Sequence, residues 1–383
     1  MRLSVASMFC GVGGLDLGFE RAGCDVVWAS DISSIAAASY PLNFGRQAVQ
    51  ADILDLDCSS IPDTDIIIGG PPCQSFSLVG LRRPDDERGR LVFRFLDIIK
   101  TKMPLGFVME NVPGLTAARI DNQRLSDRLI GSFTALGYNV TAVKLDASQY
   151  LVPQMRKRVF LIGSLRLPVT TPSSAEFAAK AYGVDINKYD NSTWAAIGDL
   201  GKPVGKGELA TYSTVKPSLF AHWMREDAHG YSLHEYPRMS ETDKRLVSFI
   251  PPGGNYTDVP DEYATQRILN FKRTGGRTTT YGRLHPCRPS YTVNTYFRRP
   301  NVGANFHPSE DRLITVREAM RLQGLPDRFH VTAGPQDARN ALIGNAVPPF
   351  MAQAVARELM RALSKTPHDL GHSFTESGFR TVA

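Results

Sequence analysis

The sequence has few cysteines and no long apolar segment. Its five cysteines, Cys10, Cys24, Cys58, Cys73 and Cys287, form no Cys-x-x-Cys pair, so neither a zinc site nor a disulfide framework is predicted. No apolar run approaches the roughly 20 residues of a membrane span. The apolar stretch at the N-terminus leads directly into a glycine loop, which predicts a first strand and not a signal peptide. We therefore expect a cytoplasmic protein with reduced thiols and no bound metal.

Acidic residues are absent from residues 263–309, although this segment carries eight Lys or Arg. The formal charge of the whole chain is only +6, and residues 1–100 hold more acidic than basic side chains. Tyr, Thr and Asn are interspersed among the basic residues of the acid-free segment. A solvated basic face would explain the charge alone. A phosphate-binding surface also explains the hydrogen-bond donors, and we prefer it.

The first third of the 383-residue chain alternates strand and helix patterns. Short β-rich runs separated by helix-length segments predict an α/β fold, with a largely parallel sheet covered by helices on both faces. After about residue 165 the alternation stops, and a loop-rich second domain follows. Helical spacing returns at 315–324, with Thr315 as N-cap and Gly324 as the stop, and again after residue 346. The expected strands are residues 3–9, 25–30, 65–70, 107–111 and 158–164.

A glycine turn follows the first expected strand. Gly11, Gly13 and Gly14 would allow a ligand to approach the backbone at the start of a helix. Asp31 lies 20 residues after Gly11, at the distance where an acid can hold both hydroxyls of a ribose. Position 16, where a dinucleotide fingerprint needs glycine, is Asp. The turn therefore predicts a nucleoside cofactor and fits NAD poorly.

Two apolar strands each end in a reactive side chain. Cys73 follows IIIGG and two prolines, and Glu110 is the last residue but one of FVMEN. Ligands of open α/β sheets bind at this edge, so both side chains are expected to face one cleft. A thiolate could add to an electron-poor ring carbon while a protonated carboxyl near a ring nitrogen absorbs charge. Taken singly, Cys73 could be a packing residue and Glu110 a turn cap.

A long polar segment follows Cys73, and such a segment is rarely a passive connector. With Gly80 and Gly89 as hinges, we expect it to close over the substrate. Arg82 and Arg83 could then contact phosphates.

Four motifs in this order resemble the cytosine-C5 methyltransferases over residues 4–350. GGPPCQSFS resembles the catalytic elbow of that family, ENV (110–112) its acidic partner, QMRKR (154–158) its paired arginines, and GNAVPP (344–349) its C-terminal cofactor block. FCGVGG is similar to its cofactor loop. The resemblance implies a doubly wound, Rossmann-like S-adenosylmethionine-dependent methyltransferase domain with an inserted, smaller target-recognition domain. The implied ranges are 1–165 and 310–365 for catalysis, 166–309 for recognition, and 366–383 as a tail.

The resemblance also implies a role for each matching residue. Cys73 would add to C6 of a flipped-out cytosine, Glu110 would hold the ring, Arg158 would steady the ring carbonyl, and Arg156 would support the catalytic loop. Simple phosphate contact is the alternative for both arginines. The implied cofactor-binding residues are Phe9, Gly11, Gly13, Gly14, Asp31, Ile32, Asp52, Ile53, Pro72, Leu91, Asn345 and Val347. The implied DNA-binding residues are Gln74, Ser77, Arg82, Arg83, Arg88, Arg273, Arg277 and Arg283.

The expected partner is double-stranded DNA, near the nucleoid, and the protein is expected to be a monomer. A restriction endonuclease acting on the same sequence is a possible second partner. An RNA cytosine-C5 methyltransferase would use the same chemistry, but the long recognition region favours DNA. A catalytically silent DNA-binding homologue would not need the reactive residues, and a nicotinamide dehydrogenase would explain neither Cys73 nor the basic segment.

Overall fold

The computed structural model describes residues 2–72, 87–120, 122–226 and 228–364. Its centre is a seven-stranded sheet with the strand order β3-β2-β1-β4-β5-β9-β8. The strands of this sheet are β1 (Ser4–Met8), β2 (Asp25–Asp31), β3 (Val49–Gln50), β4 (Ile66–Gly69), β5 (Gly106–Asn111), β8 (Asn139–Asp146) and β9 (Lys157–Ser164). Two short pairs complete the strands: β6 (Arg119–Ile120) with β7 (Gln123–Arg124), and β10 (Gly282–Arg283) with β11 (Ala304–Phe306).

The sheet is parallel from β3 to β5, and β9 then runs antiparallel to both β5 and β8. Each run that was expected as a strand forms one, so the mixed α/β expectation is confirmed. β4 and β5 are buried along their whole length, as expected for central strands covered on both faces. β8 was not expected.

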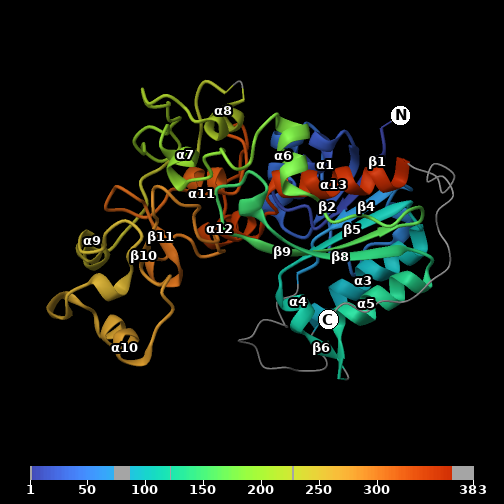
Figure 1. The fold of residues 1–383 in the computed structure, drawn as a ribbon, viewed down its shortest axis with the longest axis horizontal. Coiled ribbons are helices and arrows are strands. Elements are labelled where there is room, and N and C mark those ends of the chain that lie inside the picture. The colour runs from blue at the N-terminus through green and yellow to red at the C-terminus, as the bar shows by residue number, and fades with distance from the viewer. Residues whose placement is uncertain (1, 73–86, 121, 227, 365–383) are drawn as a thin grey trace.

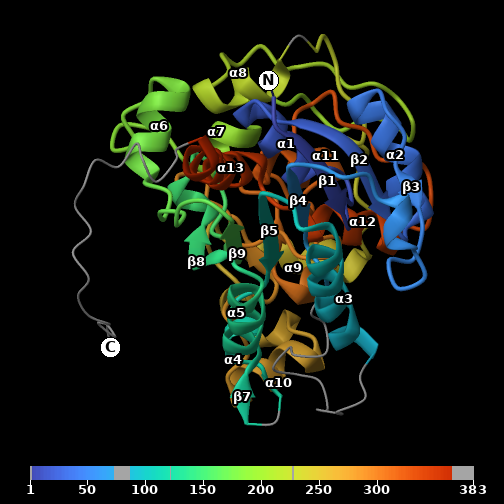
Figure 2. The same ribbon diagram turned by 90° about the vertical axis from the view of Figure 1, so that its right-hand side faces the viewer.

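Helices cover both faces of the sheet. Figure 1 shows α1 (Gly14–Ala22) and α13 (Pro349–Ser364) on one face, and α3 (Glu87–Lys102) and α5 (Leu125–Ala135) on the other. α2 (Ser34–Phe44) lies beside β2 and β3 at the edge of the sheet, as Figure 2 shows. The remaining helices are α4 (Gly114–Ala117), α6 (Ser174–Tyr182), α7 (Thr193–Ile197), α8 (Leu219–Arg225), α9 (Glu241–Ser248), α10 (Gln266–Thr274), α11 (Val316–Leu322) and α12 (Gln336–Asn345).

The predicted ends of α11 are confirmed, and α1 ends at a glycine. Gly23, with a φ of 101°, caps α1. The hydroxyl of Thr315 accepts a hydrogen bond from the Glu318 N–H, and the Glu318 carboxylate accepts one from the Thr315 N–H, which is a capping box. Gly324 lies just beyond α11 with a φ of 78°. These caps fix where the chain enters and leaves each helix.

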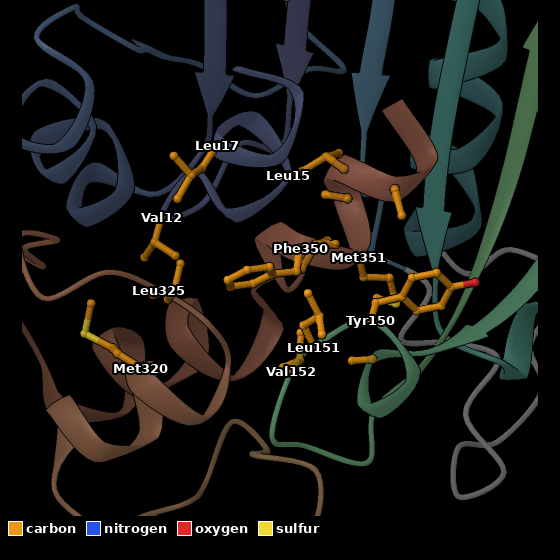
Figure 3. Close-up of a cluster of buried hydrophobic side chains, with 14 of the residues drawn as sticks. Val12, Leu15, Leu17, Tyr150, Leu151, Val152, Met320, Leu325, Phe350 and Met351 are labelled. Atoms are coloured by element: carbon orange, nitrogen blue, oxygen red, sulfur yellow. The ribbon is translucent and has the colours of Figure 1, made fainter. Parts of the chain in front are cut away.

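The C-terminal helix α13 returns to the first domain and packs against α1. A Cβ atom at Gly18 would lie 2.4 Å from Cβ of Ala352, so the two helices approach as closely as glycine allows. Figure 3 shows Phe350 and Met351 of α13 among side chains from α1 and from the loop at 150–152. The N-terminal and C-terminal parts of the chain therefore share one core.

The loop-rich part of the chain divides into two regions by its packing. Buried side chains from residues 169–233, including Phe177 and Phe220, belong to the same hydrophobic cluster as α1 and α13. Within residues 246–313, a separate cluster surrounds Ile250, Tyr256 and Phe306, whereas Leu284, Val293, Phe297 and Ala304 belong to the cluster of α1 and α13. In Figure 1, α9 and α10 lie at the end of the molecule away from the sheet. We call residues 246–313 the basic lobe.

Within the ranges that the structure describes, no helix is both long enough and apolar enough to cross a membrane.

Candidate active site

The glycine turn after β1 leaves open space beside its first glycine, Gly11. Gly11 has a φ of +55°, and a Cβ atom added there would meet nothing within 4 Å. Gly13 and Gly14 are required by packing, because added Cβ atoms would lie 2.1 Å from the Phe44 ring and 2.2 Å from the Val347 carbonyl oxygen. The space for a ligand is therefore at Gly11, where the backbone conformation also favours glycine.

Asp31 ends β2 beside this turn. Its Oδ2 accepts a hydrogen bond from the Gly11 N–H at 2.9 Å, and its Oδ1 accepts one from the Ser33 N–H at 2.8 Å. Burial raises the pKa of the Asp31 carboxyl, and these two N–H groups oppose the rise. The bonds fix the orientation of the carboxylate, and each oxygen keeps a lone pair for a hydroxyl donor.

The other predicted cofactor residues differ in exposure. Ile32, directly after Asp31, is a large apolar side chain that is 64% exposed, whereas Ile53 is buried. The Asp52 carboxylate accepts a hydrogen bond from the Leu54 N–H at 2.9 Å. Phe9 has a positive φ of 56° in the same turn. Of the others, Leu91 is half-buried, Val347 is buried, and Pro72 and Asn345 are exposed.

The elbow after β4 is attached to the end of β5. A Cβ atom at Gly70 would lie 3.0 Å from Oε2 of Glu110. The Asn111 amide donates a buried hydrogen bond of 2.9 Å to the Pro71 carbonyl oxygen. Proline has no N–H, so residues 71 and 72 cannot donate backbone hydrogen bonds that would extend the pairing of β4 with β5. The Asn111 side chain supplies the link in its place.

Cys73 lies outside the described residues, immediately after this elbow. The same holds for Gln74, Ser77, Gly80, Arg82 and Arg83, and for the side chain of Arg88. Gly89, expected as a hinge, lies in the first turn of α3.

Glu110 and Arg158 form a buried ion pair across β5 and β9. Nε of Arg158 lies 2.7 Å from Oε1 of Glu110. Burial raises the pKa of the Glu110 carboxyl above its usual value, and the guanidinium groups of Arg158 and Arg156 oppose this rise. Burial also lowers the pKa of Arg158, against the pull of Glu110. Burial and the two guanidinium groups therefore act on the Glu110 carboxyl in opposite directions.

Arg156 is held by backbone groups from distant parts of the chain. Its guanidinium donates to the carbonyl oxygens of Val293, at 3.1 Å, and Gly344, at 2.7 Å. The side chain is fully buried. Arg156 therefore joins three distant segments of the chain, and the loop after Cys73 that it was predicted to support lies outside the described residues.

The predicted DNA-binding arginines of the basic lobe are placed differently from one another. Arg273 and Arg277 are exposed, in and just after α10. Arg283 is only 5% exposed and pairs with Asp311 at 2.5 Å. The pairing neutralises the Arg283 guanidinium inside the lobe, so we do not include it among the residues proposed for DNA. The acid-free segment 263–309 gave no sign of this ion pair, because the acidic partner Asp311 lies outside that segment.

The cysteines other than Cys73 differ in exposure. Cys10 and Cys24 are buried, as structural packing residues are, and Cys58 is partly buried. Cys287 is exposed, so packing does not explain it.

Two residues with structural roles were not predicted, although they lie within motifs quoted from the sequence. Asn111 of ENV holds the elbow. Gln154 of QMRKR is fully buried and bonds two backbone groups far along the chain.

Comparison with known families decides what these features belong to. The model of the C-5 cytosine-specific DNA methylase family matches residues 3–361, which is nearly the whole chain. The chain belongs to this family. It is therefore a DNA cytosine-5-methyltransferase, and its methyl donor is S-adenosylmethionine.

Several relatives of this methylase match over most of their length. It is 34% identical to the Type II methyltransferase M.NgoFVII of Neisseria gonorrhoeae, over 94% of this chain and 87% of the relative. It is 31% identical to M.MthTI of Methanothermobacter thermautotrophicus, over 95% and 98%. A crystal structure of a candidate DNA modification methyltransferase from an E. coli prophage superposes with a TM-score of 0.68 at 26% identity, covering 95% of this chain and all of that one. S. pombe Dnmt2 shares the fold, with a TM-score of 0.60 at 17% identity over 95% of this chain and all of the other.

The glycine turn of the methylase fits its cofactor. The open position at Gly11 would admit a nucleoside against the backbone, and the fixed carboxylate of Asp31 could accept from ribose hydroxyls. The exposed apolar side chain of Ile32 would suit a base. The groups at this site are neutral or acidic, which suits a cofactor that carries a positive sulfonium and no phosphate.

Proposed function

We propose that this methylase modifies C5 of a cytosine that is flipped out of a short, specific DNA sequence, through a covalent bond between Cys73 and C6. The observation that supports this best is the buried Glu110–Arg158 pair, which lies directly beside the elbow that carries the thiol. Flipping is required because the ring atoms cannot be reached inside a duplex.

The chain's own residues divide the chemistry among them. The Cys73 thiolate adds to C6, and electron density moves to C5. Glu110 would bind the ring at N3 and stabilise the charge that develops there. Arg158 pairs with the Glu110 carboxyl and would face the ring carbonyl. Bound S-adenosylmethionine supplies the methyl group. Loss of the C5 proton to a base then expels the thiolate and restores the aromatic ring.

The cofactor would be held by the glycine turn and the strand ends around it. Asp31 would accept hydrogen bonds from the ribose hydroxyls, and Ile32 would cover one face of the adenine. Asp52, at the start of the turn after β3, would address its amino group. Leu91, Asn345 and Val347 would line the remainder of the site.

We assign sequence recognition to the region between β9 and α11. The exposed Arg273 and Arg277 lie in the acid-free segment, where phosphate or base-edge contacts need free guanidinium groups. We expect the readers of sequence among residues 190–245 and 265–282. Transfer of these residues into a relative should transfer the target sequence, and unchanged specificity would refute this assignment.

The partners and location are proposed on the same basis. Relatives named Type II methyltransferases suggest a restriction-modification role with a cognate endonuclease. We expect a monomer that acts on the nucleoid in the cytoplasm. An RNA substrate is not favoured, because the matching family is described as DNA methylase.

Mapping of 5-methylcytosine at single-base resolution tests the proposal. DNA should be taken from a methylation-free host that expresses this chain. Modification confined to one short sequence is the expected result. Unmodified DNA in the presence of soluble, well-expressed protein would contradict it.

A further inference from the structure

The residues before β9 are hydrogen-bonded to a second segment some 137 positions later. Ser290 donates to the Pro153 carbonyl oxygen through its N–H, at 2.9 Å, and through its hydroxyl, at 3.0 Å. The Met155 N–H donates to the Ser290 carbonyl oxygen at 2.8 Å, and the Thr292 hydroxyl donates to the Met155 carbonyl oxygen at 2.6 Å. Residues 153–156 and 290–293 therefore form one continuous junction.

Two fully buried side chains of this junction hold the same residue, Val293. Oε1 of Gln154 accepts a hydrogen bond from the Val293 N–H at 3.0 Å. Nη1 of Arg156 donates to the Val293 carbonyl oxygen at 3.1 Å. Both backbone polar groups of Val293 are thus satisfied by side chains two positions apart. We call Gln154 and Arg156 the Val293 clamp.

The other ends of the clamp reach the C-terminal part of the chain. Nε2 of Gln154 donates to the Leu322 carbonyl oxygen at 3.0 Å, and Nη2 of Arg156 donates to the Gly344 carbonyl oxygen at 2.7 Å. A Cβ atom at Gly344 would lie 2.5 Å from the Asn294 carbonyl carbon, so α12 ends directly against the same turn. The clamp is the point where three segments meet.

The segment held by the clamp continues into the recognition region. The Arg288 carbonyl oxygen accepts hydrogen bonds of 2.8 Å from both the N–H and the hydroxyl of Thr193, and the Trp194 N–H donates to the Pro286 carbonyl oxygen at 2.9 Å. Residues 286–293 thereby connect the start of α7 to the clamp. On the other side, Arg156 is two residues from Arg158, whose guanidinium pairs with Glu110.

From this connection we infer that Gln154 and Arg156 are positioning residues for target specificity. They fix residues 286–293, and with them the recognition region, at one distance and angle from the Glu110–Arg158 pair. Neither side chain reaches the surface, so neither contacts DNA. The inference rests on the proposed function, because it requires a sequence-specific substrate.

A single lost hydrogen bond should loosen this geometry. The planar guanidinium of Arg156 reaches two carbonyl groups at once, whereas the ammonium of lysine is a compact donor on a flexible chain. In Arg156→Lys, one of the two carbonyl groups would lose its partner. The recognition region would then adopt a wider range of positions relative to the base site, and an altered target would be rejected less strictly.

The experiment compares kcat/KM for the mapped target with kcat/KM for targets that differ by one base pair. One altered pair typically weakens specific binding by roughly 5- to 150-fold. The ratio of interest is kcat/KM for the mapped target divided by kcat/KM for an altered target. We expect Arg156→Lys to reduce this ratio at least about threefold. The matched control is Arg312→Lys. Arg312 is also buried and donates to the Leu313 carbonyl oxygen and to the carboxylates of Glu310 and Glu318, which lie outside both the clamp and the ranges assigned to sequence reading.

The ratio separates positioning from simple destabilisation. Loss of folded enzyme lowers both rates equally and leaves the ratio unchanged, which is the expectation for Arg312→Lys. If Arg156→Lys does not fold, Gln154→Glu replaces it, because glutamate still accepts from the Val293 N–H but cannot donate to Leu322. A wild-type ratio in the folded clamp variant would overturn the inference. So would an equal fall of the ratio in the control. Wild-type protein that methylates no DNA would instead refute the proposed function.

Discussion

Replacement of Glu110 by glutamine should nearly abolish methyl transfer while leaving the protein folded. The amide has the shape of the carboxyl but cannot carry a negative charge or release a proton. At 2.7 Å from Arg158, the carboxylate contributes about 6 kcal/mol of attraction at an effective dielectric constant of about 20. Desolvation offsets part of this energy. Breaking such a pair usually costs about 3–5 kcal/mol of stability. Glutamine keeps an oxygen near the guanidinium, so we expect Glu110→Gln to lower the free energy of unfolding by an amount near the lower end of this range.

The effect on catalysis should be larger than the effect on stability alone can explain. A positioned acid or base typically contributes about 10²- to 10⁴-fold in rate, and we expect kcat to fall by that amount in Glu110→Gln. The control is Glu318→Gln. Glu318 is equally buried and its carboxylate pairs with Arg312 at 2.7 Å, but it caps α11 away from the elbow.

Single-turnover methylation of the mapped target and thermal unfolding should be measured for both variants. Both are expected to unfold at lower temperature, because each loses a buried pair. Only Glu110→Gln should lose the chemical step. A Glu110→Gln enzyme that retains the wild-type kcat, or two variants that lose activity in proportion to stability, would refute the assignment of Glu110 to the ring.

Three further changes test the cofactor site, the core and the elbow. Asp31→Ala should weaken S-adenosylmethionine binding by roughly 10- to 150-fold in titration calorimetry, since hydrogen bonds to a charged group contribute about 1.5–3 kcal/mol; an unchanged Kd would exclude the ribose role. Burial raises the pKa of Asp16 from 3.8 to about 6, so the folded protein holds this proton more tightly and stability falls as pH rises between these values. Asp16→Asn should therefore be more stable than wild type by roughly 3 kcal/mol above pH 7 and should lose that advantage below pH 4 in urea unfolding; a pH-independent difference would contradict the assignment. Asn111→Asp removes the donor to the Pro71 carbonyl and should lower kcat roughly tenfold, whereas Asn43→Asp, which loses a similar bond to a backbone carbonyl, should affect only stability; equal kcat values for the two would refute the positioning of the elbow.

The central sheet and its glycine turn could be predicted because their signals are local. Apolar runs such as Ile66–Gly69 are long enough to specify a buried strand, and Gly11 adopts the positive φ that the turn requires. β8 gave no such signal. It lies at the edge of the sheet, pairs only with β9, and alternates polar and apolar side chains weakly. An edge strand of this kind depends on its neighbour, which a sequence pattern does not show.

The contacts that organise the candidate site were not predictable from local patterns. Asn111 and Gln154 bond to backbone groups 40 or more positions away, and a backbone partner has no side-chain signature. The same limit applies to Arg156, whose described partners are the backbone carbonyl groups of Val293 and Gly344. Charge alone also misplaced Arg283, whose partner lies in a different segment.

Covalent capture of Cys73 tests the central claim most directly. Duplex DNA that carries 5-fluorocytosine at the mapped position should be incubated with the enzyme and S-adenosylmethionine, then digested and examined by mass spectrometry. Fluorine at C5 cannot leave as a proton does, so the thiol cannot be expelled after the methyl group has been transferred. We predict a stable adduct on the peptide that contains Cys73, which Cys73→Ser does not form. Methyl transfer to ordinary cytosine in the same target without any adduct on this peptide would contradict the account.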